Sequence, residues 1–196
     1  MKFRETKLKG SYVIDLDKLH DERGYFARAW CQQEFCQHGL DATVVQCNVS
    51  QNPKKGTLRG LHYQDPPHAE TKIVRCARGS VYDVIVDLRP DSGTFLQWIA
   101  EELSADNGRV LYIPKGLAHG FQSLEDNSMV FYQVSEFYAR DYCRGLRWND
   151  PQLKIHWPLD VAMISSQDKA WHDLDLAKLQ PLRNLTSNSE MAHQSK

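Results

Sequence analysis

Residues 56–64 read Gly56-Thr57-Leu58-Arg59-Gly60-Leu61-His62-Tyr63-Gln64, and this stretch decides how the rest of the chain is interpreted. A strand repeats every two residues, so Leu61 and Tyr63 are expected on one face and His62 and Gln64 on the other. Histidine has the side-chain pKa closest to neutrality, which makes His62 the first candidate for moving a proton. A histidine in this setting is about as often a hydrogen-bonded core residue as a catalytic one. The other motifs must therefore decide between the two roles.

Short segments rich in β-branched and aromatic residues recur every 8–12 residues or so, separated by turns rich in glycine, proline, asparagine and aspartate. The predicted strands are 43–49, 57–63, 72–77, 80–88, 95–103, 109–113, 120–124 and 129–134. Shorter strands are expected before residue 31, a helix at 32–39, an irregular segment at 145–160 and a terminal helix at 173–179. The absence of a long helical pattern between 40 and 135 favours an all-β sandwich or barrel.

The composition is that of a globular chain with one core. With 196 residues, of which 41% are hydrophobic, one domain is expected over 1–185, followed by a polar tail at 186–196 that we expect to be disordered. The 24 basic and 25 acidic residues nearly cancel, which argues against nucleic acid or a membrane surface as partner. Five cysteines without CxxC spacing and an N-terminus without an apolar signal core predict reduced thiols and a cytoplasmic location.

A second histidine stretch reads Ile113-Pro114-Lys115-Gly116-Leu117-Ala118-His119-Gly120-Phe121. Two histidine-bearing strands, each following a glycine or proline turn, resemble the two motifs of the cupin jelly roll. Metal-binding cupins commonly carry His-x-His and Glu in the first motif, whereas Gln64 stands here in place of the second histidine. Glutamine is a poor ligand for a transition metal, so no metal is expected. His68 and Glu70 lie nearby, so a metal-dependent cupin oxygenase stays an alternative.

The ordered set of motifs resembles the dTDP-4-dehydrorhamnose 3,5-epimerase family over about residues 3–172. Besides the two histidine stretches, the matching segments are 72–75, 79–89, 147–151 and the Ser165-x-x-Asp168 motif. The resemblance implies a cupin-type double-stranded β-helix (a jelly-roll barrel) with short N-terminal strands and a C-terminal helical segment. It also implies cofactor-free epimerisation at C3, C5 or both of a nucleoside-diphosphate 4-keto-6-deoxyhexose, because the 4-keto group is itself the electron sink.

The same resemblance implies catalytic roles for four side chains. His62 would be the base, and Asp168 would orient its ring and stabilise the imidazolium. Tyr132 would be the acid on the opposite face, and its place beside Val130 and Val134 in a period of two predicts that it points into the barrel. Lys72 would stabilise the enolate oxygen. Without the resemblance, each of these residues also fits a role with no catalytic function. Asp168 would be a solvated loop carboxylate, Tyr132 a core residue with a bonded hydroxyl, and Lys72 a surface lysine at a strand end.

Substrate-binding residues follow from the resemblance in the same way. The positions that match the diphosphate contacts are Arg23, Gln46, Asn48 and Arg59, while His119 matches a position beside sugar and phosphate and Tyr138 an aromatic of the pocket wall. In this family the N-terminal segment reaches into the neighbouring subunit's site. Arg23 and Phe26 are therefore expected to serve a partner chain, which predicts a homodimer.

Two departures from the family pattern concern the nucleotide. Arg28 stands where many members have a glutamate near the nucleobase, and Gln167 stands where a lysine is common. An arginine donates where a carboxylate accepts, so a base other than thymine is an open alternative. The alternatives are a mono-epimerase, an enzyme for a CDP- or GDP-linked sugar, and a non-catalytic cupin that binds a sugar.

Overall fold

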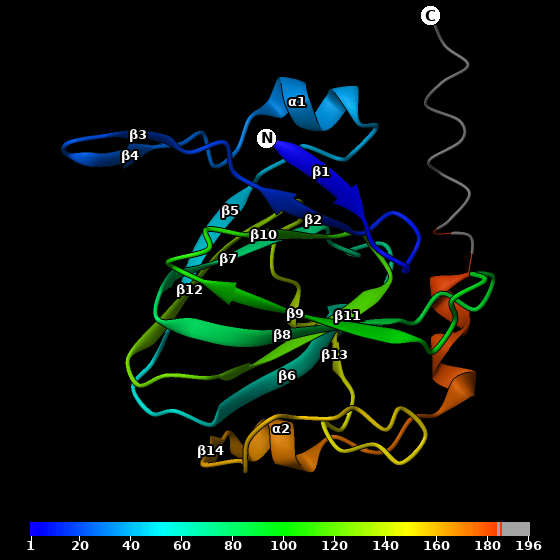
Figure 1. The fold of residues 1–196 in the computed structure, drawn as a ribbon. Helices are drawn as coiled ribbons and strands as arrows, with labels where there is room; N and C mark the ends of the chain where they lie inside the picture. Colours follow the sequence, from blue (N-terminus) through cyan, green and yellow to red (C-terminus); the bar gives the residue numbers. More distant parts are fainter. Residues whose placement is uncertain (184, 186–196) are drawn as a thin grey trace, which may run out of the picture.

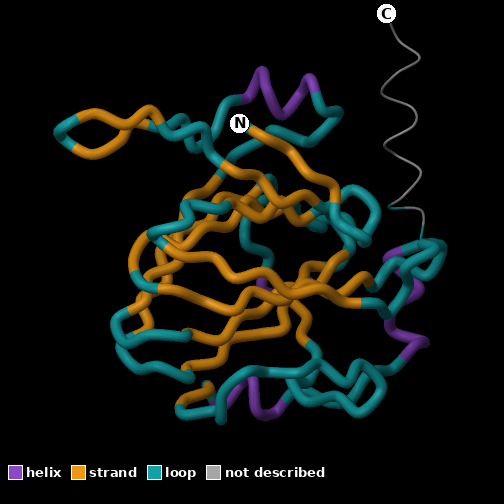
Figure 2. The backbone as a smooth tube through the Cα atoms, viewed as in Figure 1, coloured by secondary structure: helices purple, strands orange, loops and turns teal. Residues whose placement is uncertain are grey.

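The computed structural model describes residues 1–183 and 185, and most of its strands form two facing sheets (Figures 1 and 2). The first sheet runs β1 (Lys2–Glu5), β2 (Tyr12–Asp15), β10 (Val110–Ile113), β7 (Lys72–Arg78), β12 (Ser128–Val134) and β5 (Gln46–Asn52). The second runs β13 (Cys143–Gly145), β6 (Thr57–Gln64), β11 (Leu117–Ser123), β8 (Ser80–Asp87) and β9 (Trp98–Ser104). Within the two sheets all pairs are antiparallel except β14 (Met163–Ile164), which lies parallel to β6.

The remaining elements lie outside the barrel. The hairpin of β3 (Leu19–Asp21) and β4 (Gly24–Phe26) projects away from it, close to helix α1 (Gln32–Gln37) (Figure 1). Below β6 in the same view lies helix α2 (Ser166–Ala170). Two short 3-10 helices complete the described chain, at Arg140–Tyr142 and Leu176–Leu182.

Three apolar clusters hold the layers together. The central cluster joins both sheets, with Val74 of β7 and Ile85 of β8 among its fully buried members. A second cluster packs the outer side of the β6–β11–β8 sheet against the C-terminal segment through Leu61, Tyr63 and Leu179. The period of two in β6 therefore turns Leu61 and Tyr63 toward this outer cluster, leaving His62 to face the space between the sheets.

Two glycines allow the histidine strands β6 and β11 to touch. A Cβ at Gly60 would lie 2.7 Å from Gly120 Cα, and a Cβ at Gly120 would lie 2.7 Å from the Arg59 carbonyl oxygen. His119 pairs directly with His62, and a β-bulge follows between His119 and Phe121. Bulges re-aim side chains near functional sites. This contact therefore brings the two histidines together on the inner face.

The predicted fold class is confirmed, with corrections at the element boundaries. The strands expected at 43–49, 95–103 and 120–124 lie at Gln46–Asn52, Trp98–Ser104 and Leu117–Ser123. The helix expected at 173–179 is the 3-10 helix Leu176–Leu182, because Pro181 removes an amide donor that an α-helix needs. The single-domain boundary at 185 stays a prediction, and the tail at 186–196 lies outside the described residues.

The cysteines and the helices bear on the expected thiol state and on membrane crossing. All five cysteines are free thiols, as expected. Among the described residues, none of the helices has the length and apolarity that crossing a membrane requires.

Candidate active site

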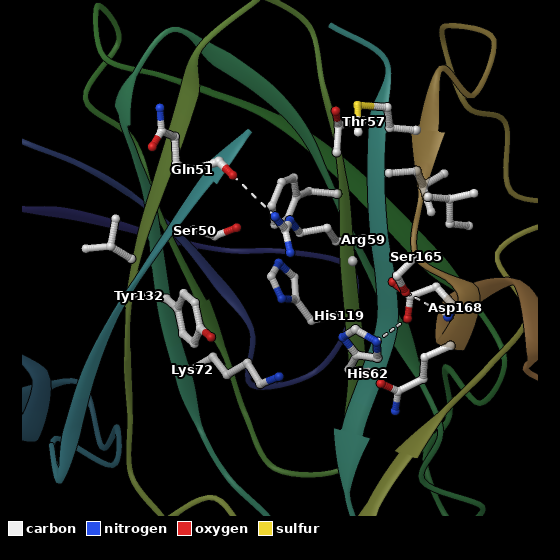
Figure 3. Close-up of a pocket in the computed structure, with 17 residues that line it drawn as sticks. Ser50, Gln51, Thr57, Arg59, His62, Lys72, His119, Tyr132, Ser165 and Asp168 are labelled. Carbon is white, nitrogen blue, oxygen red and sulfur yellow. Dashed lines mark hydrogen bonds and ion pairs between the residues drawn. The ribbon is translucent and has the colours of Figure 1, made fainter. Parts of the chain in front are cut away.

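A cavity of about 680 Å³ lies between the two sheets, and the predicted catalytic side chains line it (Figure 3). Its walls come from β5, β6, β7, β11 and β12, together with β14 and the start of α2. A smaller cavity of about 340 Å³ adjoins it. The two share His62, Lys72, Tyr132 and Gln167, so these residues stand where the two spaces meet.

His62 and Asp168 form a short polar contact in this site. Nε2 of His62 lies 2.6 Å from Oδ1 of Asp168, although 106 positions separate the two residues in sequence. Asp168 lies in α2, which starts where the Ser165 side chain accepts a hydrogen bond from the Asp168 amide. The carboxylate is 4% exposed, and its Oδ2 accepts a 3.4 Å hydrogen bond from the Gly60 amide.

The charge state of Asp168 follows from these contacts. Burial alone raises the pKa of a carboxyl group, but the hydrogen bond and the charge of His62 outweigh it, with smaller contributions from Gly60 and Ser165. The pKa of Asp168 is therefore below its usual range, so the group is ionised at neutral pH. A permanent carboxylate on Nε2 leaves Nδ1 of His62 as the nitrogen that can accept a proton from a ligand.

Lys72 begins β7, a strand with neighbours on both sides. Lys72 is only 9% exposed, and its Nζ lies 3.0 Å from Oε1 of Glu70. Both side chains line the smaller cavity. A buried ammonium needs a counter-charge, which Glu70 supplies while two further N–H donors remain for a ligand. Sequence reasoning considered Glu70 only as a remote metal ligand and missed this pairing.

Tyr132 stands on β12, in the sheet opposite the one that carries His62. It faces the cavity from the side away from His62 (Figure 3). The predicted period of two holds, because Val130 and Val134 are buried beside it. A phenol hydroxyl and an imidazole thus stand on opposite walls.

His119 also faces the cavity and is 8% exposed. Its Nε2 lies 2.9 and 3.0 Å from the two oxygens of Asp83, a fully buried carboxylate of β8. Asp83 was missed by sequence reasoning, although its place in the Asp83–Asp87 alternation of a buried strand was an available signal. The cavity is therefore lined by two histidines that are each paired with a carboxylate.

Arg59 enters the large cavity from the same strand as His62. Its Nε donates to Asn52 Oδ1 at 2.7 Å and its Nη2 to the Gln51 carbonyl at 3.2 Å. Both acceptors are neutral, so within the described chain no carboxylate forms an ion pair with this guanidinium. Its positive charge is available to an anion in the cavity.

A protein-family model described as dTDP-4-dehydrorhamnose 3,5-epimerase matches residues 5–175 of the sequence. The chain belongs to this family. A dTDP-4-dehydrorhamnose 3,5-epimerase of Methanothermobacter thermautotrophicus is 40% identical over 177 residues, covering 88% of this chain and 94% of that protein. One of Pseudomonas aeruginosa is 44% identical over 162 residues, covering 79% and 87%.

Solved structures agree with this dTDP-4-dehydrorhamnose 3,5-epimerase assignment. The enzyme from Bacillus anthracis, crystallised with TDP and PPi, has a TM-score of 0.86 and 41% identity, covering 88% of this chain and 99% of that one. The Legionella pneumophila enzyme, in complex with dTDP-4-keto-L-rhamnose, has a TM-score of 0.85 and 36% identity, covering 91% and 96%. The predicted family, jelly-roll fold and isomerase class are therefore confirmed.

The structure separates the residues expected to bind a dTDP-sugar into three groups. Arg59 and His119 line the large cavity, whereas Gln46, Asn48 and Tyr138 line the small one. Gln46 accepts a hydrogen bond from the Tyr138 amide, which ties that loop to β5.

The third group lies outside both cavities of this chain. Phe26 is 71% exposed, Arg23 pairs with Asp21, and Arg28 donates to Glu34 at 3.2 Å. Arg23 and Phe26 belong to the β3–β4 hairpin and Arg28 follows it, so none of them completes the site within one chain.

No metal centre is built from the described residues, among which no group of three or more His, Cys, Asp or Glu side chains is arranged to hold an ion. The Gln64 side chain, which stands where metal-binding cupins have a second histidine, is engaged with backbone groups. Its amide donates to the His68 and Phe137 carbonyls and accepts from the Ala139 amide, so it acts as a structural brace of the loop.

Proposed function

We propose that the chain epimerises C3, C5 or both of a nucleoside-diphosphate 4-keto-6-deoxyhexose, without a cofactor or metal, in deoxysugar biosynthesis. The observation that carries this proposal is one cavity with the His62–Asp168 pair on one wall, Tyr132 on the other and Lys72 beside them. Reversal of a stereocentre through an enolate needs a base, an acid on the opposite face and a charge near the developing oxyanion.

The steps balance without an external reactant. Nδ1 of His62 takes the proton next to the ketone, the C–H electron pair moves into the carbonyl, and an enolate forms. Asp168 stabilises the resulting imidazolium, and the Lys72 ammonium stabilises the enolate oxygen. The Tyr132 hydroxyl then returns a proton to the opposite face of the carbon. The ketone re-forms with the centre inverted, and a proton passes through water from the His62 imidazolium to the Tyr132 phenolate, which restores both side chains.

The substrate class is supported by the relatives. The Legionella pneumophila structure contains a dTDP-linked keto sugar and the Bacillus anthracis structure contains TDP and PPi. In this chain Arg59 is suited to phosphate contact, while Gln46, Asn48, His119 and Tyr138 offer polar and aromatic walls for the rest of the nucleotide sugar. We further propose a cytoplasmic homodimer in which Arg23, Phe26 and Arg28 of each hairpin region serve the partner's site.

Deuterium wash-in from heavy water, followed by NMR, tests the activity. With dTDP-, CDP- and GDP-4-keto-6-deoxyglucose in parallel, we expect exchange at C3, C5 or both with one nucleotide. His62→Ala should lower the rate by roughly 10²–10⁴-fold, the usual effect of losing a general base. Tyr132→Phe should slow inversion more than exchange, because His62 still removes the proton.

The matched control is His156→Ala, which alters an exposed histidine that lines neither cavity. Its rate should equal that of the wild type. An absence of exchange with all three substrates would exclude the epimerase and leave the sugar-binding cupin.

A mono-epimerase is a second candidate supported by a specific likeness. ChmJ, a 3'-monoepimerase from Streptomyces bikiniensis in complex with dTDP-quinovose, has a TM-score of 0.86 at 29% identity, covering 97% of this chain and 98% of that one. The same experiment separates the two, since exchange confined to one carbon indicates the mono-epimerase.

A further inference from the structure

Trp171 directly follows α2 and reaches back to the carboxylate that pairs with the proposed base. Its indole Nε1 donates to Oδ1 of Asp168 at 3.3 Å. The same oxygen accepts from His62 at 2.6 Å. Asp168 Oδ1 is therefore shared by two side chains, the base and the indole.

The indole sits on a strand residue that is itself adjacent to His62. Gly145 of β13 pairs with His62 of β6, and a Cβ at Gly145 would lie only 2.1 Å from Cε2 of Trp171 and 2.3 Å from its Nε1. The absence of a side chain at Gly145 is what makes room for the ring. Trp171 is thus held between the strand next to the base and the carboxylate that orients the base.

Besides His62 and Trp171, the Asp168 carboxylate has a side-chain contact with Ser165, which also caps α2 by accepting from the Asp168 amide. The second oxygen of Asp168 accepts from the Gly60 amide at 3.4 Å. Several other side chains line the cavity from the elements around His62, and none of them donates to Asp168: Arg59 from β6, Lys72 from β7, His119 from β11, Tyr132 from β12 and Gln167 from α2. Of these, Lys72 pairs with Glu70, and His119 pairs with Asp83.

We propose that Trp171 is a positioning residue, which holds Asp168 and thereby the His62 ring in the orientation that proton abstraction requires. The proposal rests on the proposed epimerase function. The indole N–H also withdraws part of the negative charge of Oδ1 from the imidazolium. Removal of the indole N–H should loosen one of the contacts that orient the carboxylate. It should also return that share of negative charge to the oxygen that contacts His62, which stabilises the protonated form of the imidazole.

The test is Trp171→Phe, which keeps an aromatic ring on Gly145 and removes the N–H donor. We expect kcat to fall about tenfold with KM within twofold, in keeping with one lost hydrogen bond to a charged group. The acid limb of the kcat/KM profile should move to higher pH by about half a unit. Trp157→Phe is the matched control, because its indole donates to the Trp148 carbonyl and it lines neither cavity.

A direct readout does not depend on turnover. NMR titration of the His62 ring, assigned by its loss in His62→Ala, should give a midpoint raised in Trp171→Phe and unchanged in Trp157→Phe. Gly145→Ala, which displaces the indole while keeping its N–H, should raise the midpoint in the same way. A midpoint that is unchanged or lowered in Trp171→Phe overturns the positioning role, whereas a wild-type protein without wash-in overturns the proposed function instead.

Discussion

Charge pairing around the cavity differs from residue to residue. Three basic side chains each have a carboxylate of their own: His62 with Asp168, His119 with Asp83, and Lys72 with Glu70. Arg59 instead donates to neutral oxygens. Paired groups suit proton transfer and local charge stabilisation, because their orientation is set before the ligand arrives. The Arg59 guanidinium, which has no ion-pair partner in the described part of the chain, suits the permanent negative charge of a diphosphate.

Glu70→Gln tests the pairing of Lys72. Glutamine keeps an acceptor near Nζ but removes the counter-charge from an ammonium whose side chain is 11% exposed. We expect the free energy of unfolding to fall by about 1–3 kcal/mol, as for a buried charged group that loses its partner. Urea denaturation measures this free energy. The control is Glu136→Gln, because the Glu136 carboxylate lies 3.8 Å from His68 at the surface and its loss should change the stability little. Equal stability of both variants would show that Glu70 does not support Lys72.

At the scale of elements, the turn after β8 is held by one carboxylate. Asp87 is fully buried and accepts hydrogen bonds from Arg89 Nε at 2.8 Å, Arg89 Nη2 at 2.8 Å, Ser92 Oγ at 2.6 Å and Thr94 Oγ1 at 2.7 Å. Burial raises the pKa of this carboxyl group, but Arg89 and the two hydroxyls together hold it below the usual value. The turn thus anchors a strand that pairs with β11, the His119 strand.

Asp87→Asn should lower the free energy of unfolding at neutral pH by about 3–5 kcal/mol, because Arg89 is left buried without its counter-charge. The pKa of Asp87 is lower in the folded state, so its contribution is complete above the unfolded value of about 3.9 and is lost as the pH falls through the folded value. Denaturation at neutral pH and near pH 3 measures this, and the free energy of unfolding should fall less on acidification in the variant than in the wild type. Asp91→Asn, an exposed change in the same turn, is the control.

At the scale of the whole molecule, the β3–β4 hairpin stands apart from the barrel (Figure 1). Its apolar residues are exposed, with Leu19 at 67%, Tyr25 at 50% and Phe26 at 71%. A hairpin of two three-residue strands with an exposed apolar surface is not expected to be stable by itself in water. A second copy of the chain that receives it would bury these side chains.

Subunit mixing tests the shared site that this arrangement implies. Arg23→Ala and His62→Ala homodimers should each be impaired. A heterodimer formed by co-expression should regain about half of the wild-type activity, because one of its two sites has both an intact hairpin and an intact base. Light scattering should report a dimer throughout. Activity no higher than that of the parent variants would place Arg23 in its own chain's site or outside it.

Features that depend on local geometry could be predicted from the sequence. The period of two in β6 and β12 placed His62 and Tyr132 on inner faces, and turn residues spaced the strands of an all-β barrel. The close approach of β6 and β11 at Gly60 and Gly120 was not predicted and is a finding of the structure. The boundaries of β5, β9 and β11 were misplaced by about three residues, because sheet pairing rather than propensity ends a strand.

Which charged groups meet became visible only in the folded chain. Glu70, Asp83 and Trp171 carry no local signal that pairs them with Lys72, His119 and Asp168. Strand register brings Asp83 to His119 across 36 positions, and burial makes an unpaired charge there too costly. Glu70 and Trp171 are close in sequence to Lys72 and Asp168, and the folded backbone path shows that their side chains meet. For the same reason the His62–Asp168 pair came from family resemblance at the sequence level, and its 2.6 Å contact became visible only in the fold.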